Sequence, residues 1–377
     1  MLFQSIKAVG GRAGVSALSL CVAHYSSGVG PRAEGLCEAA AAPECVLRFG
    51  LIADVQYCDI EDGMNFGGTE YRYYRGSLGG ARRAVAGFNE AFREKESLAF
   101  VAQLGDLIDG QNSGSYGEGL KWREAPRSRV ALDEVMAVLR GTDARVPFYH
   151  AIGNHELYNF DGAGLRAGPL NAAPHTIAVE GKHYFSFSPA PGWTFVMLHP
   201  YEISSMQPRD SAGYRAAAAL FAKHNPNDVL GGPCNFFEGL EGDAMRFVPF
   251  NGGCGPVQIA WLKGVLFAAR TRGDVVVVFS HLPIFHEAAS WRNVAFDAPE
   301  VLGELQASGN VAAVFAGHSH RGGYAVDETG IAHCTVEATL THDTAFAIAD
   351  CRGDGSLSIT GFGDVPSRDI RPPPSRR

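Results

Sequence analysis

The stretch Phe100-Val101-Ala102-Gln103-Leu104-Gly105-Asp106-Leu107-Ile108-Asp109-Gly110 joins an apolar run to two carboxylates. The apolar half is typical of a buried strand, and Gly105 marks the point at which the chain leaves the sheet. Asp106 and Asp109 follow directly. In open α/β sheets the loops after the strands face one crevice, so carboxylates placed there can meet groups brought by other strands. The stretch therefore predicts a functional site at a strand end.

Four other apolar runs also end in residue types that bind metal ions: Ile52–Gln56, Ala151–Glu156, Val278–His281 and Phe315–His320. A single aspartate at a strand end is more often a turn residue, and a single histidine is more often a structural one. Five strand ends that carry ligand types in succession are not explained in that way. They predict one site built from Asp54, Gln56, Asp106, Asn154, His281, His318 and His320.

The composition argues against several classes of protein. With 32 basic and 40 acidic side chains the formal net charge is −8, whereas a nucleic-acid-binding protein is more often basic. No stretch approaches the roughly 18 to 20 apolar residues of a membrane span. The eight cysteines form no C-x-x-C pair, and a chain of this length does not need disulfides, so we expect free thiols. The sequence does not indicate an oligomeric state.

Residues 1–44 differ from the rest of the chain, because Lys7, Arg12 and Arg32 come before the first acidic residue, Glu34. This composition resembles an organellar transit segment, and the alternative is an extension without targeting value. The expected location is thus cytoplasmic, or organellar if residues 1–44 act as a transit segment. Because the candidate ligands extend over most of the chain, we expect one domain over residues 45–368 and a disordered tail over 369–377.

The hydrophobic pattern predicts an α/β fold with two sheets. Strands at 46–53 and 98–104 are separated by a helical pattern from Leu78, which indicates a parallel pair with a right-handed crossover. The fully apolar runs at 275–279 and 311–315 are typical of strands covered on both faces. A hairpin over 183–198 indicates a second, more antiparallel sheet, which we expect the strands at 331–336, 345–349 and 356–359 to complete. Asp297 is expected to cap the helix that follows it.

The set of candidate ligands also predicts chemistry. Carboxylates, imidazoles and amides in this number exceed what one ion needs, and they suit two divalent cations about 3.5 to 4 Å apart, bridged by one carboxylate. Such a pair can hold the attacking and leaving oxygens of a phosphoryl displacement. The prediction is therefore hydrolysis of a phosphate ester or anhydride. A structural zinc module would need thiolate spacing that is absent from the sequence.

The ligand-bearing segments resemble the five sequence blocks of the calcineurin-like metallophosphoesterase superfamily, in the usual order: Asp54-x-Gln56, Gly105-Asp106-x-x-Asp109, Gly153-Asn154-His155-Glu156, His281 and Gly317-His318-x-His320. The resemblance implies a sandwich of two mixed β-sheets flanked by helices, in αββα layers. It further implies that one metal is held by Asp54, Gln56, Asp106 and His320 and the other by Asp106, Asn154, His281 and His318. His155 would face the substrate, where it stabilises phosphoryl oxygens or protonates the leaving phosphate, and Asp109 would orient it.

Gln56 restricts the resemblance to a smaller part of the superfamily, because most of its members have histidine at that position. Together with Asp62–Thr69, Arg72–Arg75 and Phe250–Gly253, it is similar to the manganese-dependent ADP-ribose/CDP-alcohol diphosphatase family. That resemblance implies an enzyme that hydrolyses ADP-ribose to AMP and ribose 5-phosphate, and also CDP-alcohols such as CDP-choline and CDP-glycerol. It implies two divalent metal ions, with Mn²⁺ preferred over Mg²⁺, and partners that are nucleoside-diphosphate-linked small molecules. Candidate substrate contacts are Phe66, Arg72, Arg75 and Asn251.

Two alternatives remain beside this expectation. The first is another metallophosphoesterase, such as a phosphomonoesterase or a cyclic-nucleotide phosphodiesterase, against which Gln56 and the loop after it argue. The second is a catalytically silent binding scaffold of the same fold. The complete ligand set and the presence of His155 argue against that, because an inactive relative is expected to have lost at least one of these residues.

Overall fold

The computed structural model describes residues 44–65, 68–95, 97–114, 126–171, 176–232 and 234–373. Phe66, almost all of the expected N-terminal extension and the last four residues lie outside this part of the chain. Within the described ranges no helix is long and apolar enough to cross a bilayer. The cysteines in those ranges are free thiols, as expected.

Two large sheets form the centre of the fold. The first has the strand order β15-β14-β13-β1-β4-β5, with the bounds Arg368–Ile370, Leu357–Gly363, Ala345–Arg352, Cys45–Ile52, Leu98–Gln103 and Phe148–His150. The second has the order β11-β12-β10-β9-β8-β7-β6, with the bounds Gly323–Val326, Ala332–Thr335, Val311–Ala316, Val275–Ser280, Trp193–Met197, Phe185–Ala190 and Ile177–Ala178. A separate hairpin pairs β2 (Gly63–Met64) with β3 (Tyr71–Arg72).

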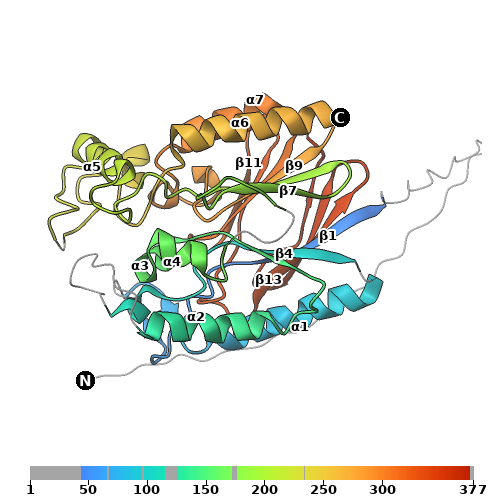
Figure 1. The fold of residues 1–377 in the computed structure, drawn as a ribbon, viewed down its shortest axis with the longest axis horizontal. Helices are drawn as coiled ribbons and strands as arrows, with labels where there is room; N and C mark the ends of the chain where they lie inside the picture. Colours follow the sequence, from blue (N-terminus) through green and yellow to red (C-terminus); the bar gives the residue numbers. More distant parts are fainter. Residues whose placement is uncertain are drawn as a thin grey trace, which may run out of the picture. The chain divides into compact units, whose positions relative to one another are not determined.

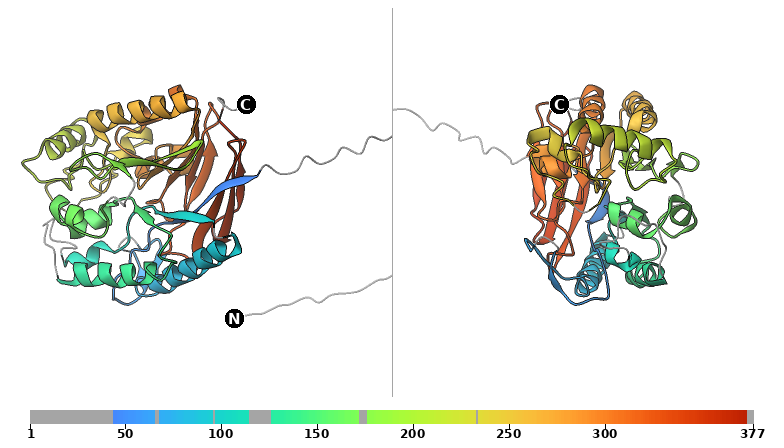
Figure 2. Two further views of the ribbon diagram at one scale, coloured as in Figure 1. Left: turned by 45° about the vertical axis from the view of Figure 1, so that its right-hand side comes forward. Right: turned by 90° about the vertical axis from the view of Figure 1, so that its left-hand side faces the viewer.

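Helices cover the outer face of each sheet. The first sheet is covered by α1 (Ser77–Lys95) with α2 (Pro126–Leu139) beside it, and the second by α6 (Gly255–Arg272) and α7 (Ala298–Ser308) (Figure 1, Figure 2). The expected αββα sandwich is therefore confirmed. Three further helices lie at one end of the sandwich: α3 (Asn154–Asn159), α4 (Gly162–Ala167) and α5 (Ala212–His224) (Figure 1).

Buried phenylalanines fill the space between the sheets. Phe49 of β1 stacks on Phe100 of β4 with ring centroids 5.2 Å apart, and it packs edge-to-face with Phe195 and Phe279 of the second sheet at centroid distances of 5.5 and 5.7 Å. Each such aromatic pair contributes about 0.5 to 1.5 kcal/mol beyond the burial of its surface. This packing fixes the two sheets face to face.

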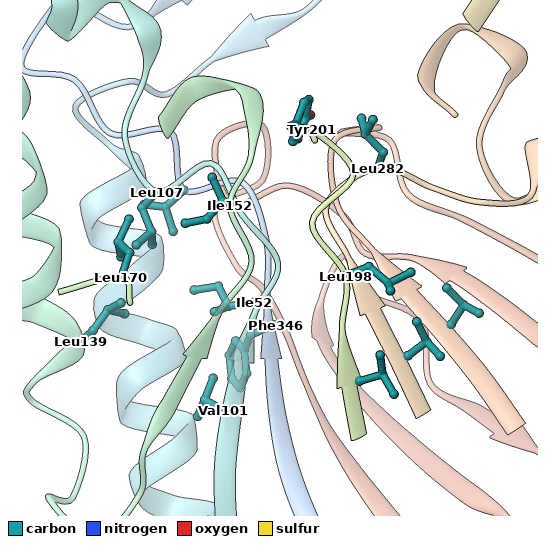
Figure 3. Close-up of a cluster of buried hydrophobic side chains, with 14 of the residues drawn as sticks. Ile52, Val101, Leu107, Leu139, Ile152, Leu170, Leu198, Tyr201, Leu282 and Phe346 are labelled. Atoms are coloured by element: carbon teal, nitrogen blue, oxygen red, sulfur yellow. The ribbon is translucent and has the colours of Figure 1, made fainter. Parts of the chain in front are cut away.

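The direction of the strands brings both sheets' loops to one edge. β1, β4 and β5 are mutually parallel, and so are β8, β9 and β10. Figure 3 shows Leu107 and Ile152 on loops of the first sheet, opposite Leu198 and Leu282 near the strand ends of the second. Because carboxyl ends of parallel strands share an edge, the ligand-bearing loops face one another across the sandwich.

Two expectations about individual elements were wrong. The strands predicted at 345–349 and 356–359, which correspond to β13 and β14, join the first sheet rather than the second, with β13 antiparallel to β1. The chain crosses between the sheets after β12, where Thr339 N donates to the carbonyl of Ala53. Asp297 occupies the N-cap position of α7, but its side chain does not cap the helix, since its carboxylate accepts the N–H groups of Cys254 and Gly255 at the start of α6. The predicted domain end at residue 368 falls inside β15.

Candidate metal centre

Four of the predicted ligands have a left-handed backbone. The φ angles are 48° at Asp54, 41° at Gln56, 57° at Asp106 and 66° at His318, and among the described residues these are the non-glycine positions with positive φ. Such a conformation is unfavourable for residues with a Cβ atom, so the surrounding structure must hold it. Backbone hydrogen bonds between the loops do so, for example from Asp54 N to Gly105 O and from Gln56 N to Asp106 O. As a result, the backbone turns sharply where it leaves each of these strands.

Asp106 lies at the middle of the cluster. Its Oδ2 is 3.1 Å from Gln56 Nε2 on one side and 3.3 Å from His281 Nε2 on the other, while its Oδ1 accepts the N–H of His155 at 2.8 Å. Burial alone would raise the pKa of Asp106, but the facing imidazoles of His281 and His155 outweigh it and hold the pKa below its usual range. This is the place that a bridging carboxylate requires.

Two histidines and an amide converge on one side of Asp106. Asn154 Oδ1 is 3.2 Å from His281 Nε2 and 3.1 Å from His318 Nδ1, and these two ring nitrogens are 3.2 Å apart. One donor atom each from Asp106, His281 and His318 fall within 4.8 Å of one another, close enough to hold a metal ion together. The structure thus brings together all four residues that were predicted to hold one metal.

The remaining predicted ligands converge on the other side. Gln56 Nε2 is 3.0 Å from His320 Nε2, which is 3.8 Å from Asp54 Oδ1. Gln56 Oε1 is buried and has no hydrogen-bond partner, and turning the amide over would exchange it with Nε2, so that the oxygen would face His320 and Asp106. Burial raises the pKa of Asp54 to about 6 against the opposing influence of His281 and His320. Buried carboxylates and an unpartnered amide oxygen fit a divalent cation.

Each of the three histidines also has an acceptor behind its ring. His281 Nδ1 lies 2.7 Å from the carbonyl of Leu104, His318 Nε2 lies 3.1 Å from Asn251 Oδ1, and His320 Nδ1 lies 2.9 Å from Glu70 Oε2. These oxygens can only accept, so the outer nitrogen of each ring donates the hydrogen bond, which leaves the inner nitrogen to bind a metal ion. Metal-binding histidines have this arrangement.

Asn251, which the sequence suggested as a substrate contact, is fully buried behind His318. Its Nδ2 donates to the carbonyls of Arg246 and Arg292 at 2.9 and 2.7 Å, which leaves Oδ1 for the ring of His318. All of its side-chain polar atoms therefore have protein partners. Asn251 thus supports the ring of His318 from behind.

The structure adds a carboxylate that sequence reasoning missed. Glu156 is fully buried; its Oε2 accepts the N–H groups of Asp106 and Gly153, and its Oε1 accepts that of Leu107, at 2.6 to 2.9 Å. It thereby ties together the loops that follow β4 and β5. Burial and the neighbouring Asp106 raise the pKa of Glu156 to about 7. The available sequence signal was its position directly after Asn154 and His155.

His155 is buried beside the cluster, but it is not one of the side chains whose ligand atoms converge there. Its Nε2 is 4.0 Å from Asp106 Oδ2, and its Nδ1 accepts the N–H of Gly110 at 2.7 Å, so the neutral ring carries its proton on Nε2. Burial lowers the pKa of His155, although Asp106 and Asp109 oppose this. Asp109 Oδ2 is 3.4 Å from Nδ1 and has no hydrogen bond, and its Oδ1 accepts from Gln111 N. Asp109 thus lies beside the ring, and Gly110 makes the shorter contact.

The candidate arginines have protein partners in the structure. Arg72 Nε lies 3.3 Å from Glu70 Oε2, and the half-exposed Arg75 is paired with Asp59 and Glu61 at 2.7 and 2.9 Å. A different ring comes near the cluster: that of Phe250, which is half-buried and lies 5.8 Å from the ring of His318, with Phe237 6.1 Å further on.

A family model described as calcineurin-like phosphoesterase matches residues 47–322, and the chain belongs to that family of metal-dependent phosphoesterases. Its relatives narrow the assignment. The manganese-dependent ADP-ribose/CDP-alcohol diphosphatase of Bos taurus is 34% identical over 338 residues, which cover 86% of this chain and 94% of the relative. The protein of that name from Danio rerio is 38% identical over 317 residues, covering 81% and 92%. The chain is thus a member of the manganese-dependent ADP-ribose/CDP-alcohol diphosphatase family.

A solved structure agrees with this assignment. The crystal structure of a dimetal phosphatase from Danio rerio superimposes with a TM-score of 0.77 at 35% sequence identity. The match covers 87% of this chain and 99% of that one. The fold described above is therefore that of a dimetal phosphatase.

Proposed function

We propose that this chain is a phosphoric anhydride hydrolase that uses two manganese ions to cleave the diphosphate of ADP-ribose, giving AMP and ribose 5-phosphate. The same site would cleave CDP-alcohols such as CDP-choline and CDP-glycerol. The names of the relatives support the substrate class, and the name of the structural neighbour supports two metals.

The observation that carries the proposal is the convergence of ligand side chains from five strand ends on Asp106. One side consists of Asn154, His281 and His318, and the other of Asp54, Gln56 and His320, whose partner distances are given above. Two divalent cations bound there supply Lewis-acid activation of water and offset the charge of a diphosphate.

The residues of the chain then have distinct tasks. Asp106 holds both sides of the centre together, because its carboxylate faces Gln56 and His281 at once. His155 presents its Nε2 proton next to Asp106, and Gly110 fixes that tautomer from behind. A fixed donor in a buried site stabilises charge that develops on a phosphoryl oxygen or on the leaving phosphate.

The ring of Phe250 supports a nucleoside substrate. It is half-buried beside His318, so one end of a substrate can contact the ring while its diphosphate meets the metal ligands. Stacking on an aromatic side chain is worth about 1 to 3 kcal/mol per base. This placement favours a diphosphate that carries a base over a simple phosphomonoester.

Gln56 supports the preference for manganese. A neutral amide oxygen is a harder and weaker ligand than imidazole, and oxygen ligands suit Mn²⁺ or Mg²⁺ better than the later metals. His281 and His318, on the other side of Asp106, favour a softer ion than Mg²⁺. Mn²⁺ satisfies both sides, so Mg²⁺ is expected to be the weaker activator.

The test is a parallel assay of the full chain with ADP-ribose, CDP-choline, p-nitrophenyl phosphate and a cyclic nucleotide, each with Mn²⁺ and with Mg²⁺. We expect turnover of the two diphosphates with Mn²⁺ and much less with Mg²⁺. A preference for p-nitrophenyl phosphate or the cyclic nucleotide would identify another metallophosphoesterase. A chain that binds Mn²⁺ and turns over none of the four compounds would be a silent scaffold.

A further inference from the structure

The three histidines of the metal centre differ in the chemistry of the group behind the ring. A backbone carbonyl stands behind His281, and the neutral amide of Asn251 stands behind His318. Behind His320 stands the carboxylate of Glu70, with Oε2 at 2.9 Å from Nδ1. Of the three rings, His320 alone therefore has an acceptor that carries a formal negative charge.

Glu70 belongs to the small hairpin rather than to either large sheet. It immediately precedes β3, and its carbonyl accepts the N–H of Asn65 across the hairpin. Its Oε2 also accepts from Arg72 Nε at 3.3 Å, and its side chain is only 19% exposed. One carboxylate thus contacts both the loop after β10, which carries His320, and the hairpin that carries Arg72.

A carboxylate in this position acts on the ring in two ways. It can only accept a hydrogen bond, so it keeps the proton on Nδ1 and leaves the lone pair of His320 Nε2 directed at Gln56 and Asp54. It also makes the ring a stronger ligand, because the negative charge raises the basicity of the imidazole.

A stronger histidine ligand matters most on the side of Asp106 that contains Gln56 and His320. The opposite side contains the imidazoles of His281 and His318, whereas this side combines a single imidazole with the weaker amide of Gln56. A charged partner behind His320 compensates for that weaker donor.

We infer that Glu70 is a positioning residue of the metal centre: it fixes His320 as an Nε2 ligand, strengthens metal binding on the Gln56 side, and holds the β2–β3 hairpin against the site. The inference rests on the two-metal centre of the proposed function. It makes metal occupancy next to Gln56 depend on a residue that reaches the predicted ligands through its hydrogen bond to His320.

The test measures Mn²⁺ binding to the full chain, stripped of metal, without any substrate, by isothermal titration and by the electron paramagnetic resonance of free Mn²⁺. Glu70→Ala should weaken one of two classes of site by about 10- to 100-fold and leave the other class unchanged. Glu70→Gln should fall between this variant and the wild type, since glutamine can still accept from Nδ1 but carries no charge. The matched control is Glu61→Gln, because Glu61 lies just before β2 with a side chain 91% exposed and pairs with Arg75.

The possible outcomes separate this inference from the proposed function. The inference about Glu70 is wrong if Glu70→Ala binds both Mn²⁺ ions as tightly as the wild type. It is also wrong if Glu61→Gln loses as much Mn²⁺ affinity as Glu70→Ala, or if Glu70→Ala weakens both classes of site equally. A wild-type chain that binds a single Mn²⁺ overturns it as well. If Glu70→Ala does not fold, which its melting temperature without metal reports, Glu70→Gln decides in its place. Two bound Mn²⁺ ions without turnover of any substrate would refute the proposed function, and the binding curves of the variants would still decide the role of Glu70.

Discussion

Replacing Glu156 by glutamine tests whether this buried carboxylate holds the metal-binding loops in place. The amide keeps the volume but changes one acceptor oxygen into a donor. In the more favourable orientation the oxygen still faces Asp106 N and Gly153 N, and the NH₂ group faces Leu107 N, whose hydrogen bond is lost. An unsatisfied buried N–H costs about 1 to 3 kcal/mol. Relief of the repulsion from Asp106, which contributes to the raised pKa of Glu156, offsets part of this cost.

We therefore expect Glu156→Gln to lower the free energy of unfolding by about 1 to 2 kcal/mol and kcat by about 10- to 100-fold, because Asp106 loses part of its support and small displacements of reacting groups are costly. Urea unfolding without metal measures the first quantity, and ADP-ribose hydrolysis with Mn²⁺ the second. The control is Glu90→Gln, an exposed position on α1. If Glu156→Gln matches this control in both measurements, the carboxylate does not support the site and the reasoning is refuted.

Four further outcomes are expected. Asp106→Asn should lower kcat by at least about 10³-fold without unfolding the chain, and retention of a tenth of the activity would show that Asp106 is not the bridge. His155→Ala should lower kcat by about 10² to 10⁴-fold with bound manganese unchanged; loss of metal would make His155 a ligand. Gln56→His should tighten metal binding and widen the range of activating metals, and identical metal titrations for variant and wild type would contradict this. Burial lowers the pKa of His150 to about 4 from 6.5, so the stability that its neutral form contributes is present above pH 6.5 and lost toward pH 4, with a slope of up to about 1.4 kcal/mol per pH unit. His150→Gln should flatten that slope in urea unfolding, and an unchanged slope would exclude His150 as its source.

The sequence alone predicted those strands and helices whose hydrophobic pattern has a single interpretation. The runs 275–279 and 311–315 are apolar throughout and became central strands, and the spacing from Leu78 became α1. The ligand types stood directly after those strands, so their convergence followed from strand direction alone. Sheet membership did not follow in the same way. β13 is buried on both faces, and such a pattern fits a strand of either sheet.

The residues that support the ligands were harder to predict, because their partners are distant in the sequence. Glu70 meets His320 across 250 positions, and Asn251 meets His318 across 67. Glutamate and asparagine in loops are ordinary surface residues, and no local pattern indicates that a histidine ring will lie behind them. Asp297 was misassigned for a related reason: an aspartate before a helix usually caps it, but here the start of α6 lies within reach of its carboxylate.

The left-handed backbone at Asp54, Gln56, Asp106 and His318 limits how far this protein can be made more heat-resistant. Each such conformation costs about 1 kcal/mol or more, somewhat less for aspartate, and glycine adopts it freely. Glycine at any of these four positions would relieve the cost of the backbone conformation, but every such change deletes a metal-binding side chain. Variants that stay active must gain their stability elsewhere, for instance in exposed loops and helix ends. Natural selection faces the same restriction, so the protein cannot remove the conformational cost at these four positions while it remains an enzyme.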